Sequence, residues 1–158
     1  MRLRVLTGVI ATATLLSGCQ FTVPGHLYPI QGPEAAQSPP VIYDVSATGA
    51  MRDDTGELFG GSITATLANS ETCSGSWSPV PTGDNTAGQM SVQWDQVYGP
   101  GFFVANVLGN GHFSRTTTLT CSKGDSLNIE FFNPSRLKPG NSKGVAQDSK
   151  GNLYKVTF

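Results

Sequence analysis

Apolar and polar residues alternate with a period of two through most of the chain after residue 40. Residues 41–47, 63–67 and 127–131 each place an apolar or small side chain at every second position. Such alternation is typical of β-strands with one buried face. No stretch after residue 40 sustains the 3.6-residue period of an amphipathic helix. The pattern predicts about nine short strands, in segments 41–47, 63–67, 73–77, 90–94, 102–108, 113–121, 127–131, 144–148 and 153–158.

The connections between these segments are short and rich in turn residues, such as 109–111 and 123–125. Parallel strands need crossover connections of a dozen or more residues, so short turns favour antiparallel neighbours. We therefore expect one all-β domain over residues 41–158, built as a small antiparallel β-sandwich or β-barrel of about eight to nine short strands. The alternation alone leaves sandwich and barrel equally open.

Residues 90–94 show the cleanest alternation in the chain, and residues 102–108 are nearly all apolar, as in a strand covered on both faces. An alternative concerns the aromatic residues around the Gly99-Pro100-Gly101 breaker. Trp94, Tyr98, Phe102 and Phe103 could form an exposed binding patch, because aromatic residues dominate interface hot spots. The apolar faces of the predicted strands otherwise define the expected core: Trp77, Trp94, Phe113, Leu119, Leu127, Ile129 and Phe131.

The first 18 residues have the organisation of an export signal. Arg2 and Arg4 provide a positive start, residues 5–16 form an apolar run, and the small residues Ser17 and Gly18 follow. The run is shorter than the about 20 apolar residues that a membrane-spanning helix needs. This segment is therefore expected to be a signal peptide.

The sequence Leu16-Ser17-Gly18-Cys19 resembles the lipobox of bacterial lipoproteins. The resemblance implies cleavage before Cys19, attachment of diacylglycerol to its sulfur, and N-acylation by a fatty acid such as palmitate. Two or three acyl chains make membrane binding stable, at roughly 0.8 kcal/mol per buried CH₂. The family's sorting rule implies the outer membrane for Gln20 after the cysteine, on its periplasmic or its surface side. An ordinary secretory signal with an incidental Cys19 is the alternative.

Five prolines between residues 20 and 40 suggest a tether. Proline fixes φ and cannot donate to a sheet ladder, so residues 19–40 are expected to hold the domain away from the membrane as a semi-extended linker. Four residues in it are too apolar for a pure linker and suggest that part of it packs on the domain: Phe21, Leu27, Tyr28 and Ile30. The expected organisation is therefore a signal peptide (1–18), a lipidated cysteine with its Pro-rich tether (19–40) and an all-β domain (41–158). The prolines are Pro24, Pro29, Pro33, Pro39 and Pro40.

Composition excludes some partners. Cleavage before Cys19 removes Arg2 and Arg4 and leaves 140 residues with 8 basic and 11 acidic side chains, a net charge of −3. This mildly acidic chain has no basic cluster, so we expect no nucleic-acid binding and no electrostatic attachment to a membrane. The remaining length suits a single domain with a substantial core.

Two cysteines remain after lipidation, Cys73 and Cys121, and both lie at inward-facing positions of predicted strands. Export places them in an oxidising compartment, and two is an even count. We predict a disulfide between them. Free buried thiols are the alternative, and a zinc site is disfavoured because the pair has no CxxC spacing.

Residues 144–154 resemble one hairpin of NHL-type β-propeller repeats, which read G-x-A-x-D-x-x-G-N-x-Y. The match occurs once, and a propeller needs at least four blades of about 40 residues. We expect only the shared hairpin chemistry, in which Asp148 caps the turn and Gly151 takes a positive φ.

No catalytic constellation is readable in the sequence. His112 lacks a recognisable nucleophile, orienting group and oxyanion hole, and His26 lacks a second metal-type neighbour. We therefore expect no catalytic residues, no metal and no cofactor. An enzyme whose site gathers Asp95, His112 and Glu130 from separate strands is a remaining alternative.

The expected protein is thus a non-enzymatic binding or accessory lipoprotein of the cell envelope, with an envelope protein or a glycan as its partner. A lysozyme-inhibitor-like lipoprotein is the main alternative, since such inhibitors include small lipid-anchored β-barrels. Their Ser-Gly-x-x-Tyr motif is absent here, and residues 73–77 are at best a loose echo of it.

Overall fold

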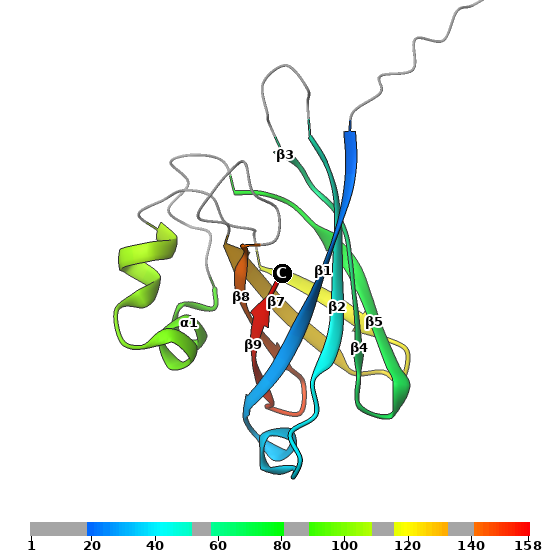
Figure 1. Cartoon of the computed structure of the whole chain (residues 1–158), viewed down its shortest axis with the longest axis vertical. Coiled ribbons are helices and arrows are strands. Elements are labelled where there is room, and N and C mark those ends of the chain that lie inside the picture. The colour runs from blue at the N-terminus through cyan, green and yellow to red at the C-terminus, as the bar shows by residue number, and fades with distance from the viewer. Residues whose placement is uncertain (1–18, 52–57, 81–88, 109–115, 133–140) are drawn as a thin grey trace, which may run out of the picture.

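Eight antiparallel strands close on themselves to form a β-barrel (Figure 1). The computed structural model describes residues 19–51, 58–80, 89–108, 116–132 and 141–158. Nine strands are assigned, of which the two-residue β3 pairs only with the end of β2. Their bounds are β1 Cys19–Gln31, β2 Tyr43–Met51, β3 Leu58–Phe59, β4 Gly61–Leu67, β5 Glu71–Trp77, β6 Thr117–Cys121, β7 Ser126–Phe132, β8 Lys143–Asp148 and β9 Leu153–Thr157.

The barrel is an up-and-down meander. The order around the wall is β1-β9-β8-β7-β6-β5-β4-β2, and pairing of β1 with β2 closes the ring. Each strand therefore lies beside its neighbours in the chain, as the short turns predicted. Closure removes the exposed sheet edges that a sandwich would retain. The structure thereby confirms the all-β prediction and decides between its two architectures.

The predicted tether is wrong in its first half, because residues 19–31 form β1. The prolines are tolerated because β1 has one neighbour along most of its length. It pairs with β2 from Cys19 to Leu27 and with β9 only from His26 onward. Pro24 therefore lies where only β2 is paired, and Pro29 where only β9 is paired. Proline, which lacks a backbone N–H, is compatible with a strand at positions that have a paired neighbour on one side only.

The connection after β1 contains a short 3₁₀ helix, η1 (Pro33–Ala36), and a second 3₁₀ turn, η2 (Ala68–Ser70), joins β4 to β5. Both lie at the end of the barrel opposite Cys19 (Figure 1). The second half of the predicted tether thus crosses this end from β1 to β2.

The two strands predicted between residues 90 and 108 are wrong, because this segment is helical. It forms α1 (Ser91–Tyr98) and a π-helical turn, η3 (Phe103–Val107). Met90 and Trp94 are four residues apart, a spacing that places two side chains on one face of a helix as well as on one face of a strand. Val92, which a strand would bury with them, is 63% exposed. The apolar run after residue 101 is likewise only partly covered, with Val104 66% exposed.

Two apolar clusters stabilise the fold. The first fills the barrel interior and includes Trp77, Leu119, Leu127 and Ile129, all buried as predicted, with Phe131 partly buried against it. The second joins α1 and η3 to the outer face of β7 and β8, and it consists of Val80, Met90, Trp94, Phe103, Val107, Phe132 and Val145. Phe113 lies outside the described residues.

Candidate functional site

Cys19, the residue predicted to carry lipid, is the first residue of β1 and lies opposite Met51 of β2. The ladder continues without interruption through Gln20↔Ala50 and Phe21↔Gly49. The candidate attachment point is therefore part of the barrel wall, at the end where β1, β2 and β3 extend beyond the other strands (Figure 1). We call residues 19–25 and 45–51 the β1–β2 extension.

A shallow groove of about 210 Å³ lies on the β1–β2 extension. Its lining comes from residues 20–22, 48–50 and 60–61. Small residues leave this space open. Gly61 is required there, since a Cβ would come within 2.0 Å of the Thr48 carbonyl oxygen.

The predicted disulfide joins two neighbouring strands of the barrel. Cys73 of β5 is in direct register with Cys121 of β6, and the two sulfur atoms are 1.99 Å apart. Both residues are buried, as their inward parity predicted. The link closes a loop spanning 48 positions of sequence and therefore ties the first half of the meander to the second.

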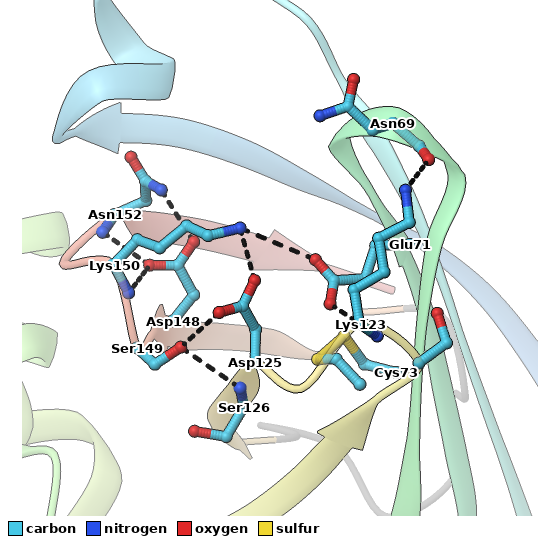
Figure 2. Close-up of polar contacts among 12 residues, drawn as sticks. Asn69, Glu71, Cys73, Lys123, Asp125, Ser126, Asp148, Ser149, Lys150 and Asn152 are labelled. Atoms are coloured by element: carbon cyan, nitrogen blue, oxygen red, sulfur yellow. Dashed lines mark hydrogen bonds and ion pairs between the residues drawn. A yellow bond between two sulfur atoms is a disulfide. The ribbon is translucent and has the colours of Figure 1, made fainter.

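The barrel end opposite Cys19 carries a network of polar side chains. Charged side chains from its turns contact one another, as Figure 2 shows. We call this network, from the η2, β6–β7 and β8–β9 turns, the polar end. It comprises Glu71, Lys123, Asp125, Asp148, Ser149, Lys150 and Asn152.

Lys150 is the central cation of the polar end. Its ammonium contacts the Asp125 carboxylate and lies 3.7 Å from Oε2 of Glu71 (Figure 2). The hydrogen bond from Lys150 lowers the pKa of Asp125, and the same contact raises the pKa of Lys150. Both groups therefore stay charged around neutral pH, and the pair links the β6–β7 turn to the β8–β9 turn.

Glu71 is almost fully buried and links three turns of the polar end. Its Oε1 accepts a hydrogen bond of 3.2 Å from the backbone N–H of Lys123. The Lys123 ammonium in turn donates to the carbonyl oxygen of Asn69, at 2.6 Å. The sequence pattern did not predict this network, although lysines and acidic residues beside the hairpin turns were an available signal.

Asp148 organises the β8–β9 turn, as the hairpin comparison predicted. Its Oδ1 accepts hydrogen bonds from the backbone N–H groups of Lys150 and Asn152, at 3.0 and 2.8 Å. Gly151 has a φ of 85°, which glycine adopts without a steric penalty. The turn therefore has one defined conformation.

A buried tyrosine joins Asp148 to η1. The Tyr154 hydroxyl is 2.9 Å from Oδ2 of Asp148 and 3.2 Å from Oε2 of Glu34. Burial and the neighbouring Asp148 raise the pKa of Tyr154 above its ordinary value. Burial, together with Glu34, also raises the pKa of Tyr43 to about 12. These hydroxyls therefore stay protonated and hold η1 across the barrel end.

Burial of Trp94 in the core is confirmed, and the alternative of an exposed aromatic patch is wrong for two of its four members. Trp94 is fully buried and Phe103 is 6% exposed, while Tyr98 and Phe102 are half-buried. Trp94, Tyr98 and Phe102 stack with ring centroids 4.7 to 6.0 Å apart. These aromatic residues pack against the outside of the barrel because α1 needs an apolar face to contact β8 and β9.

Two lysines cover the outer side of this stack. The Lys143 ammonium lies 5.8 Å from the centroids of both Tyr98 and Phe102, and Lys155 lies 5.8 Å from that of Tyr98. Such cation–π contacts contribute about 0.5–1 kcal/mol at exposed sites. The Tyr98 hydroxyl lies 3.2 Å from the Gly144 carbonyl oxygen, and burial raises its pKa to about 12.

Asp95 and Glu130, two of the three residues considered for a scattered catalytic site, bind different groups. Asp95 accepts hydrogen bonds from the backbone N–H groups of Phe103 and Gly101, which lower its pKa. Glu130 is fully buried beneath α1. His112 lies outside the described residues. Asp95 thus holds the backbone of residues 101–103, and Glu130 holds the start of α1 through Met90 and Trp94.

Within the described ranges, no group of three or more His, Cys, Asp or Glu residues is arranged to hold a metal ion. The described helices also include none that is long and apolar enough to cross a membrane. No family model matches this chain, and no curated protein or solved structure shows significant similarity to it. The functional argument therefore depends on the residues themselves.

Proposed function

We propose that this protein is a lipid-anchored component of a bacterial cell envelope, in which the barrel is a non-enzymatic binding or accessory module. One observation carries the proposal. All eight strands of the closed barrel lie between Cys19 and Thr157. Cleavage before Cys19 would therefore leave the whole barrel intact and would place the acylated residue at its first strand position.

The outward face of the barrel supports placement of this domain in water beside the membrane. Alternate residues on β4, β5 and β6 are exposed and carry hydroxyl groups, while the positions between them are buried or, at Gly75, partly buried. These three strands therefore present hydroxyl groups rather than apolar side chains on their outer face. Acyl chains on Cys19 would then supply the membrane attachment. The exposed hydroxyl residues are Ser62, Thr64, Thr66, Thr72, Ser74, Ser76, Thr118 and Thr120.

The partner we propose is an envelope protein or a glycan. The lysozyme-inhibitor alternative gains no support from the segment that suggested it. Residues 73–77 form β5 rather than a loop, with Cys73 and Trp77 buried in the core. A hypothetical Cβ on Gly75 would be 2.8 Å from Leu119, so this glycine serves strand packing.

The test is Cys19→Ala in a bacterium fed labelled palmitate. The wild type should carry label and sediment with membranes, whereas the variant should carry none and either remain uncut or become soluble. Two control variants sharpen the result. Cys73→Ser/Cys121→Ser should retain the label, and Gln20→Asp should retain the label while moving to the inner membrane. Label on Cys19→Ala, or a cleaved Cys19→Ala protein that still sediments with membranes, would contradict the proposal.

A further inference from the structure

The candidate lipid attachment point has no linker in front of the fold. Cys19 is already in register with Met51, and the next residues of β1 continue the same ladder. β9 joins β1 only at His26. The β2–β4 ladder ends at Ala47, which lies opposite Val23. The outer part of the β1–β2 extension, residues 19–22 and 48–51, therefore projects beyond this ladder by four residues, about 13 Å at the ~3.3 Å rise of a strand.

The extension is fastened to the barrel core. The indole Nε1 of Trp77 donates a hydrogen bond of 2.7 Å to the carbonyl oxygen of Thr48. Phe21 packs on the same core cluster. A Cβ at Gly49 would be 2.5 Å from the Phe21 ring and 3.0 Å from the Trp77 ring. The two aromatic rings therefore close over Gly49 and leave no hinge between the extension and the barrel.

A rigid extension that begins at an acylated residue determines how the barrel sits on its membrane. Resting on the lipid anchor proposed above, we propose that the β1–β2 extension docks end-on against the lipid headgroups and holds the polar end away from the bilayer. The partner of this surface is the lipid layer itself. No flexible residue lies between Cys19 and the ladder, so the barrel cannot reorient freely about its anchor.

The surface around Cys19 suits a headgroup layer. The groove lined by residues 20–22, 48–50 and 60–61 lies at this end. Phe59 is 44% exposed there and pairs with Ala50 across β2 and β3. Exposed aromatic side chains are favourable at the boundary between headgroups and acyl chains. At the opposite end, Ala36 of η1 is exposed, which provides a distal reference position.

The experiment measures energy transfer to a headgroup-labelled lipid. The acylated mature protein is placed in phosphatidylethanolamine–phosphatidylglycerol vesicles, with a dye on a keto-phenylalanine at position 59 or position 36. Transfer should be several-fold stronger from position 59, because the 13-residue β1 separates the two ends by about 40 Å. Unchanged melting temperatures would verify that both labelled variants fold. Equal transfer from both positions, or stronger transfer from position 36, would overturn the proposed orientation.

Two further experiments distinguish failure of the proposed orientation from failure of the proposed lipid anchor. An eight-residue Gly-Ser insertion between Cys19 and Gln20 should abolish most of the difference between the two positions, while a persistent difference would overturn the role of the missing linker. The unlipidated domain coupled at Cys19 to a maleimide lipid should reproduce the asymmetry. Absence of acyl mass on Cys19 of the native protein contradicts the anchor, whereas symmetrical transfer in the coupled protein contradicts the orientation.

Discussion

The indole Nε1 of Trp94 donates a hydrogen bond of 2.9 Å to Oε2 of Glu130, and both side chains are fully buried. The other carboxylate oxygen of Glu130 accepts from the backbone N–H of Met90 at 3.1 Å and from the Thr116 hydroxyl. One acidic residue on the outer face of β7 thereby holds the start of α1. This attachment explains how a short helix remains fixed to the outside of the barrel.

Trp94→Ala should lower the free energy of unfolding by about 3–5 kcal/mol, because it removes a fully buried ring from the second apolar cluster. Urea denaturation measures this loss. Val92→Ala is the matched control in the same helix and should change stability by no more than about 0.5 kcal/mol, since Val92 is 63% exposed. An unchanged midpoint for Trp94→Ala would contradict its assignment to the core.

Trp94 and Glu130 should be energetically coupled. A double-mutant cycle of Trp94→Phe and Glu130→Gln isolates their interaction, and we expect a coupling energy of about 1 kcal/mol or more. Glu130→Leu should lower the free energy of unfolding more than Trp94→Phe or Glu130→Gln does. It leaves three hydrogen-bond donors without their acceptor, from Met90, Trp94 and Thr116. Additive effects in the cycle would show that the hydrogen bond contributes nothing beyond packing.

The Cys73–Cys121 pair should appear as one linked peptide in mass spectrometry under non-reducing conditions. For a loop of this length, the chain-entropy account assigns the bond roughly 4 kcal/mol of stability. Cys73→Ala/Cys121→Ala should accordingly lower the melting temperature by many degrees. Free thiols on both residues after purification without reductant would contradict the disulfide.

The Asp125–Lys150 pair should make stability depend on pH at both ends of the range. The folded state lowers the pKa of Asp125, so its contribution is complete above the ordinary value of about 3.9 and is lost as pH falls through the folded value. The folded state raises the pKa of Lys150, so its contribution is complete below about 10.4 and is lost at higher pH.

Melting temperatures measured across pH test this pair. Asp125→Asn should flatten the acid limb, and Lys150→Gln should reduce the loss on the alkaline side. Tyr154→Phe is the comparison for the alkaline limb, because the folded state also raises the pKa of Tyr154. Acid limbs that coincide for Asp125→Asn and wild type would show that the pair has no measurable linkage.

Local alternation was sufficient to identify seven strands of the barrel and the inward positions of Cys73 and Cys121. These residues lie in elements whose side-chain period is visible over a few positions, and short turns specified their antiparallel order. Asp148 and Gly151 were likewise readable, because a hairpin turn is determined by the residues within it.

Only the tertiary structure decided that residues 19–31 enter the barrel and that residues 91–107 are helical. Pro24 and Pro29 are compatible with a strand only because β2 and β9 flank different halves of β1, and no local pattern contains that information. Met90 and Trp94 fit either period, and the outer face of β7 and β8 selects the helix. Closure of the ring and the polar end also join residues far apart in the chain, so they follow from spatial packing rather than from neighbouring residues.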